Sequence, residues 1–545
     1  MASVLAFISV VLIVAAASKI NQTYDEPFHV ARGLQWYQTD KYDYIHHPPL
    51  APVCFATPLQ VMGAEYEEHG HKLSDGNQIL YSGDYAWNLA AARSGNLLFY
   101  LLMIVACWFW ARLLATPPLL VVGCVSLFPP VLAHAGLATS DLAITCGILW
   151  YAYFGRCFLA APCARSGASF GVSIAACLLA KFSAVVFLPL VAVSLAIVDM
   201  HLVRKALNAR RIELASGAVL AVAVAALCVW GGYRFSFGTV EEVRWHSSNP
   251  LRFPFVSDNT NRRLLALTVP APEFVGGILS VLHQNREGHY SYFLGESVSR
   301  SSVLYFPVLL LTKSPIPLLL LSIVGFASKR PHAWVPAFVI MAILAPACLS
   351  NINIGVRHIL PVYPWLGILA AMGFTGLRGQ ALAPIRSFSV ILLAWAGFGV
   401  VVSMPDLLPY FNEFAFGRPE RITVDSDLDW GQDLQRLGDE IRERQIAHIH
   451  IAYFGTAVVE KHIPTGVRVH HLKPHTRVSG WVAVSAFNRF ATKGYEWLDN
   501  YEKACVVGAS IYLYHIPRGR NAGHPAPPQR TLRAELPEKA PTSDN

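Results

Sequence analysis

Charged side chains are scarce in this chain. Asp, Glu, Lys and Arg make up 14% of the 545 residues, hydrophobic residues make up 54%, and the mean hydropathy is +0.40. Soluble domains carry about 25% charged residues, and a chain with so few has too little polar surface to enclose a core of this size. The composition therefore excludes a large soluble protein and predicts an integral membrane protein with many spans.

Several ligand-binding patterns are absent as well. The sequence has no CxxC pair, no His-rich metal spacing and no basic stretch interleaved with aromatic residues, so it predicts neither a zinc site nor a nucleic-acid partner. A disulfide framework is not expected either, because eight of the ten cysteines lie in or beside apolar runs, where cysteine serves as a small apolar residue: Cys107, Cys124, Cys146, Cys157, Cys163, Cys177, Cys228 and Cys348.

The chain does contain ten apolar runs that suit membrane helices. The run 168–198 is long and is interrupted by Lys181. If it crossed once, the basic segment 204–211 would lie on the opposite side from the other short basic loops, against the positive-inside rule. A split at Lys181 removes the conflict and predicts about eleven spans with the C-terminus outside. The runs are about 3–19, 94–111, 116–134, 141–160, 168–198, 213–231, 301–327, 332–350, 357–376 and 387–404.

The first run ends in Ala15-Ala16-Ala17-Ser18, which resembles a signal-peptidase site, but no Lys or Arg precedes it. We expect an uncleaved first helix, and with either reading the next segment lies outside. Two long polar segments, the first outer loop 20–93 and the second outer loop 233–300, are expected to carry helices that lie along the membrane surface.

The composition changes at about residue 405, which predicts three parts. Residues 1–405 form the transmembrane domain, 406–517 form a small soluble α/β domain outside the membrane, and the Pro-, Arg-, Glu- and Ala-rich tail 518–545 is expected to be disordered. In the α/β domain we expect strands at 421–425, 447–453, 480–486 and 505–516, and a helix at 431–444.

Polar residues that interrupt the apolar runs share one face. Random interruptions would divide between both ends of the spans, whereas these all fall at the outer ends. Ionisable residues near a bilayer are costly and usually functional, so one polar cavity opening to the outside is predicted. The residues are Asp25, Glu26, His46, His47, Asp141, Lys181, Lys313, Arg357 and His358.

Two stretches of the first outer loop carry a family resemblance. Thr23-Tyr24-Asp25-Glu26-Pro27-Phe28-His29 and His46-His47-Pro48-Pro49-Leu50 resemble the first-loop motifs of the dolichyl-phosphate-mannose protein mannosyltransferase superfamily, which includes bacterial lipid A aminoarabinose transferases. The resemblance covers about residues 1–405 and is firmest in this loop. It implies the GT-C glycosyltransferase fold and an inverting transfer from a polyprenyl-phosphate sugar.

The resemblance also implies roles for Asp25 and Asp141, two of three candidate acids. It places the general base at Asp25, and a carboxylate there can take the proton of a hydroxyl that attacks an anomeric carbon; helix capping is the alternative. Glu26 is expected to orient Asp25, to bind acceptor or metal, or only to favour the helix N-terminus. Asp141 matches the family's second acid, with a helix cap again as the alternative.

Five residues are predicted to contact the donor phosphate: His47, Lys181, Lys313, Arg357 and His358. The alternatives are lysines that extend to the membrane surface, an arginine that pairs with an outer carboxylate, and an interfacial histidine pair in a Pro-rich turn. His46 is a substrate or metal candidate. The aminoarabinose transferases have a pair resembling Glu-Lys where His46 and His47 stand, so this chain departs from them there.

One further acidic cluster, Asp425, Asp427, Asp429 and Asp433, lacks the Gly and distant Glu of an EF-hand. We interpret it as turn and helix-capping residues.

Together these features predict a glycosyltransferase that moves a sugar from a polyprenyl-phosphate donor to a lipid, glycan or protein acceptor at the outer face of a bacterial cytoplasmic membrane. The second outer loop lacks room for the large luminal insert of the eukaryotic mannosyltransferases, which favours a bacterial source. The sequence requires no cofactor and is compatible with a divalent metal. The alternative is a transporter or lipid-linked-sugar flippase, although such proteins place ionisable residues near the bilayer midplane and often contain inverted repeats.

Overall fold

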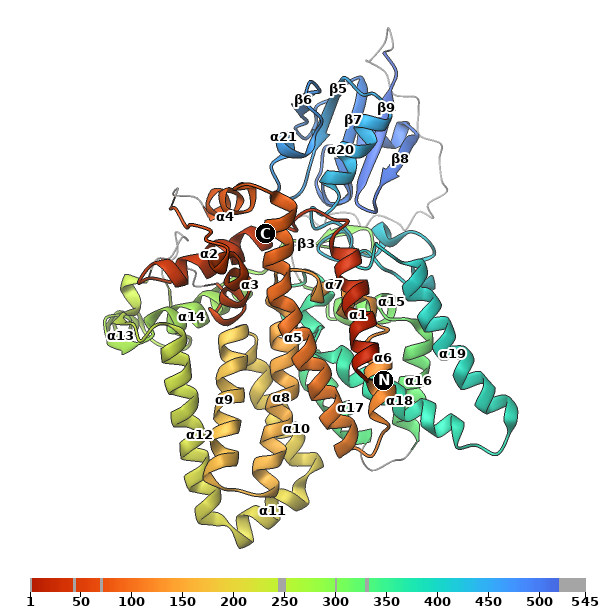
Figure 1. The fold of residues 1–545 in the computed structure, drawn as a ribbon. Helices are drawn as coiled ribbons and strands as arrows, with labels where there is room; N and C mark the ends of the chain where they lie inside the picture. Colours follow the sequence, from red (N-terminus) through yellow and green to blue (C-terminus); the bar gives the residue numbers. More distant parts are fainter. Residues whose placement is uncertain are drawn as a thin grey trace, which may run out of the picture.

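The computed structural model describes residues 2–42, 46–68, 72–243, 251–298, 301–328 and 333–518. A bundle of helices carries a small sheet domain at one end (Figure 1). The helices of the bundle are α1 (Ala2–Ala17), α5 (Tyr85–Leu113), α6 (Pro118–Val125), α7 (Pro129–Ala135), α8 (Asp141–Ala160), α9 (Ala164–Ala180), α10 (Ala184–Val198), α11 (Met200–Ala209), α12 (Arg211–Gly232), α15 (Tyr305–Lys313), α16 (Ile316–Ala327), α17 (Trp334–Cys348), α18 (Val362–Arg378) and α19 (Ala383–Val402).

The expected helical membrane architecture is confirmed. Among the described residues, four helices are long and apolar enough to cross a membrane, α5, α8, α12 and α19, and the number is seven if each of three bent pairs forms one span. Each of the eleven expected spans contains a helix, although α1, α9 and α17 are shorter apolar helices of 10–17 residues.

The breaks in the helices follow polar residues and prolines. Helix α9 ends at Ala180, Lys181 is extended, and α10 begins at Ala184, so the expected break at Lys181 is confirmed. Helices α15 and α16 meet at 110°, because Pro315 lacks the amide hydrogen that would continue α15. This bend agrees with an initial segment that lies along the membrane surface.

The helices of the two outer loops lie at the end of the bundle that carries the sheet domain (Figure 1). The first loop contains α2 (Glu26–Gln38), α3 (Leu50–Val61) and α4 (Lys72–Tyr81); the second contains α13 (Asp258–Leu265), α14 (Pro272–Glu287) and two short antiparallel strand pairs. The pairs join β1 (Phe237–Thr239) with β2 (Thr268–Pro270) across α13, and β3 (Ser291–Phe293) with β4 (Glu296–Val298) in a hairpin.

The sheet domain has five strands in the order β6-β5-β7-β9-β8. Strands β5 (His448–Ala452), β6 (Arg468–His471) and β7 (Gly480–Ser485) are parallel, whereas β9 (Ile511–Ile516) is antiparallel to β7 and to β8 (Lys503–Val507). Helices α20 (Leu434–Glu443) and α21 (Val459–His462) complete the domain. One apolar cluster includes Leu437, Ile449 and Leu513, and another includes Val482, Val484 and Tyr514.

The strand predictions are correct at 447–453 and 480–486, and 505–516 is a hairpin of two strands. The strand expected at 421–425 is wrong. A 3-10 helix at Pro419–Arg421 and a series of turns replace it. Instead of joining a sheet, the acids of this segment accept hydrogen bonds from backbone amides, among them those of Val356 and Phe487, as described below.

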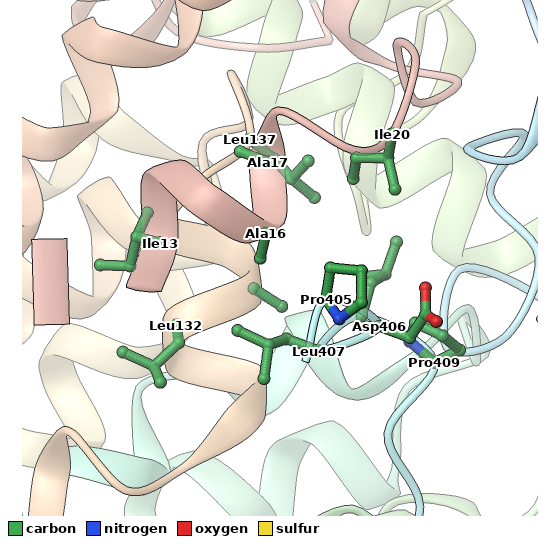
Figure 2. A pocket seen from close by; sticks show the side chains of 12 residues that line it. Ile13, Ala16, Ala17, Ile20, Leu132, Leu137, Pro405, Asp406, Leu407 and Pro409 are labelled. Carbon is green, nitrogen blue, oxygen red and sulfur yellow. The ribbon is translucent and has the colours of Figure 1, made fainter. Parts of the chain in front are cut away.

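The segment between α19 and α20, which we call the joining segment, packs into the bundle. Leu407, Leu408, Ile422 and Trp430 belong to the same apolar core as the membrane helices. Figure 2 shows a hollow where Pro405–Pro409 crosses α1 and α7; its volume is about 10 Å³, enough for about one water molecule. The sheet domain is therefore tied closely to the bundle.

Candidate active site

A cavity of about 650 Å³ lies at the end of the bundle next to the sheet domain. Six of the nine residues predicted to converge there line it: Asp25, His46, His47, Lys181, Arg357 and His358. These come from the first outer loop, the break between α9 and α10, and the segment before α18. The expected convergence of distant polar residues is thus observed for most of the set.

Asp25 occupies the N-cap position of α2, but its side chain makes no hydrogen bond to the helix amides. The carboxylate instead forms an ion pair with Arg357, on the 3-10 helix η3 (Val356–Ile359). The guanidinium of Arg357 lies 4.4 Å above the ring of Trp430, a cation–π geometry. The arginine is thereby fixed between an acid of the first loop and an indole of the joining segment.

A second ion pair borders the cavity. Asp141, the first residue of α8, is buried, and its Oδ1 lies 2.5 Å from Nζ of Lys181. Asp141 does not itself line the cavity, whereas Lys181 does. The extended backbone at Lys181 places its side chain between the acid and the open space, so Asp141 holds the lysine in position.

The histidines are tied to neighbouring elements. The Nδ1 atom of His46 lies 2.9 Å from Oγ of Ser280 on α14, which links the two outer loops. His47 meets the ring of His29 edge-on at 4.7 Å. Burial lowers the pKa of His29 to about 4 and lowers that of His47 well below its usual value. Both rings are therefore neutral at pH 7. Lys181 and Arg357 supply positive charge to the cavity lining.

This burial predicts a pH dependence of stability. Between pH 6.5 and about 4 the unfolded chain binds a proton at His29 that the folded chain does not bind, so stability falls as the pH falls through this interval, by up to about 3 kcal/mol. The His29→Gln variant should show a shallower decline than the wild type in thermal denaturation measured from pH 7.5 to 4. His201→Gln, on the exposed face of α11, is the control and should follow the wild type; equal slopes for all three proteins would contradict the prediction.

Glu26 is fully buried and does not line the cavity. Its carboxylate accepts two hydrogen bonds of 2.8 Å from Arg93, one of 2.7 Å from the amide of Thr23 and one of 2.8 Å from the amide of Ala138. It thus joins α5, the start of α2 and the segment before α8. Among the roles expected for Glu26, this geometry favours the orientation of Asp25.

Lys313 also lies away from the cavity lining. Its Nζ donates hydrogen bonds of 2.8 Å to the carbonyls of Leu408 and Asp427 and lies 4.3 Å from the ring of Phe411. The side chain is 1% exposed, so it neither extends to the membrane surface nor reaches the cavity in this structure. Lys313 therefore connects α15 to the joining segment through these hydrogen bonds.

Among the cavity residues that the sequence analysis did not assign to the site are Asp425, Trp430, Phe454 and Phe487. All of them follow residue 405, in the part expected to be a separate soluble module. A signal was present, because Trp430 and three acids in alternation are an unusual content for a simple exposed turn. No group of three or more His, Cys, Asp or Glu in the described ranges is arranged to hold a metal ion.

The fold and the cavity define a helical membrane protein whose charged site lies between the bundle and a sheet domain. No protein-family model and no curated protein matches the chain. Solved structures do. ArnT from Cupriavidus metallidurans bound to undecaprenyl phosphate is 14% identical, with 94% of this chain and 97% of that chain covered and a TM-score of 0.47. The apo form of ArnT gives 13%, the same coverage and 0.45.

The Pmt1–Pmt2 protein O-mannosyltransferase complex of S. cerevisiae, bound to its sugar donor, is 11% identical, with 74% of this chain and 89% of that chain covered and a TM-score of 0.48. These structures come from groups that the first-loop motifs resemble, so the expected resemblance is found. It is a distant likeness in overall architecture.

Proposed function

We propose that this protein is an integral-membrane glycosyltransferase that moves a sugar from a polyprenyl-phosphate donor to an acceptor at the outer face of the membrane. The observation that carries the proposal is the cavity, in which a carboxylate, Asp25, is paired with Arg357 and shares the lining with Lys181, a second cation that Asp141 holds. Apolar residues of α10 and α17, among them Phe187 and Ala347, line the same space and suit a polyprenyl chain.

The chemistry follows from this arrangement. Asp25 accepts the proton of the acceptor hydroxyl while the hydroxyl oxygen forms a bond to the anomeric carbon of the donor sugar. The bond from that carbon to the phosphate oxygen breaks at the same time. Lys181 and Arg357 stabilise the charge on the departing polyprenyl phosphate. His47 and His358 add hydrogen bonds, Asp141 positions Lys181, and Glu26 and Lys313 hold the surrounding segments.

The ion pair between Asp25 and Arg357 determines that the donor binds before the acceptor reacts. Without donor, the arginine neutralises the carboxylate and restrains it. A donor phosphate competes for the guanidinium, so its arrival frees Asp25 to act as a base. Donor binding is then required before the acceptor can react.

The orientation is proposed from charge. Helix α11, which carries Arg204 and Lys205, lies at the end of the bundle opposite the sheet domain (Figure 1). Basic segments remain on the cytoplasmic side, so the cavity and the sheet domain face the outside, the periplasm in a bacterial cytoplasmic membrane.

The test is a transfer assay with the purified full chain in liposomes that contain a radiolabelled polyprenyl-phosphate hexose or aminopentose. We expect label to move to an added hydroxyl acceptor while free polyprenyl phosphate appears in equal amount. Label that stays on the lipid but changes leaflet would overturn the proposal and identify a flippase, the function that the helix break at Lys181 also suits.

A further inference from the structure

Asp425, Asp427 and Asp429 occupy alternate positions in the joining segment, and their carboxylates make different contacts. Asp427 accepts the amide of Val356 at 3.0 and 3.2 Å and lies 3.8 Å from Lys313. Asp429 accepts the amides of Phe487 at 2.8 Å and Gly431 at 3.2 Å. These two acids therefore hold the segment against η3 and the sheet domain.

Asp425 has no such structural task. It is 8% exposed and lines the cavity. Its Oδ1 accepts only the neighbouring amide of Ser426 at 2.6 Å, and Oδ2 accepts no hydrogen bond from any other part of the described chain. Burial raises the pKa of this carboxyl, while the charge of Arg357 opposes the rise. A buried carboxylate oxygen that accepts no hydrogen bond is costly, and a ligand with hydroxyl groups in the cavity would supply the missing donor.

Aromatic side chains of the sheet domain line the cavity beside this segment. The rings of Phe454 and Phe487 stack with centroids 4.0 Å apart, and Tyr24 stacks on Phe454 at 5.4 Å. The amide of Tyr24 donates to the carbonyl of Trp430 at 3.0 Å, and Asp429 holds the amide of Phe487. The aromatic wall and Asp425 thus belong to one connected framework.

We propose that Asp425, Phe454 and Phe487 form the acceptor subsite, and that the acceptor is a carbohydrate. This proposal rests on the glycosyltransferase function argued above. A sugar ring has hydroxyl groups on its rim, which hydrogen-bond to a carboxylate, and apolar C–H faces, which pack against aromatic rings. With one hydroxyl at Asp425 and another at Asp25, the ring lies across Arg357, which contacts the donor phosphate. The sheet domain therefore recognises the acceptor.

The first experiment measures binding without donor. The full chain is purified in a zwitterionic detergent, because a detergent with a sugar headgroup would compete, and is titrated with methyl hexosides, hexose disaccharides, a Ser/Thr peptide and a long-chain alcohol, observed by saturation-transfer NMR. We expect the saccharides alone to bind. Asp425→Asn and Phe454→Leu should each weaken that binding about tenfold or more, and Asp439→Asn, an exposed acid-to-amide change on α20, should not.

The second experiment separates this subsite from the catalytic proposal. In the transfer assay, Asp425→Asn should raise the KM for the saccharide about tenfold and leave the KM for the donor unchanged. Asp25→Asn should lower the rate of transfer by a factor of about 10²–10⁴ yet retain saccharide binding. If the wild type binds saccharide but transfers nothing, the proposed function fails and the subsite remains. Equal saccharide binding by wild type, Asp425→Asn and Phe454→Leu, or wild-type binding of only the peptide or the alcohol, would overturn the subsite. Phe454→Leu decides the question if Asp425→Asn does not fold.

Discussion

Replacing Asp25 by Asn is expected to lower the rate of sugar transfer by a factor of about 10²–10⁴, the usual contribution of a general base. The amide keeps the size of the side chain but cannot take the proton of the acceptor hydroxyl. The loss should lie in kcat, because Lys181 and Arg357, and not Asp25, are the residues proposed to contact the donor phosphate. Initial rates measured at several concentrations of donor and acceptor would separate the two constants.

The matched control is Asp40→Asn, in the same outer loop, where the carboxylate is fully exposed and lies 3.5 Å from Arg234. An exposed pair of this kind contributes little to stability, so the control should transfer at the wild-type rate. Both variants need a thermal denaturation curve, because Asp25→Asn also removes the partner of Arg357. Unchanged kcat in a folded Asp25→Asn protein would remove Asp25 from the mechanism.

Much of the bundle could be predicted because hydrophobic periodicity and basic loops are local signals. The break at Lys181 is an example, since a single lysine in a long apolar run cannot remain in the lipid without a partner. Its partner, Asp141, was also among the residues assigned to the same face. Pairing of Arg357 with an outer carboxylate was one of the alternatives that the sequence left open, but the partner could not be identified, because Asp25 and Arg357 lie 332 positions apart.

The joining segment shows where local patterns stop being informative. Asp425, Asp427 and Asp429 look alike in the sequence, and an alternating pattern next to apolar residues is typical of a strand. Their different roles arise from what each meets: the amide of Val356 and Lys313 for Asp427, the amide of Phe487 for Asp429, and the cavity for Asp425. Only the tertiary contacts separate a structural acid from one that faces a ligand.

The role of Glu26 also depends on tertiary contacts. The sequence predicts it in the active site, whereas the structure places it in a buried ion pair with Arg93. Glu26→Gln is expected to destabilise the protein by about 3–5 kcal/mol, the usual result of leaving one member of a buried pair without its partner. Arg93, which is 5% exposed, would retain its charge, and the amides of Thr23 and Ala138 would compete for one uncharged oxygen. Thermal denaturation in detergent, compared with wild type and with Glu65→Gln at an exposed position of the same loop, measures this loss.

A double-variant cycle then distinguishes orientation of Asp25 from direct catalysis by Glu26. Adding Arg93→Met to Glu26→Gln removes the stranded charge, so the double variant should be more stable than the sum of the two single losses predicts, by several kcal/mol. Transfer activity should recover in part along with stability, because Asp25 is then placed again at the start of α2. If the single variant Glu26→Gln instead denatures like the wild type and yet transfers no sugar, the ion pair is not what makes Glu26 necessary, and the glutamate takes part in the reaction itself.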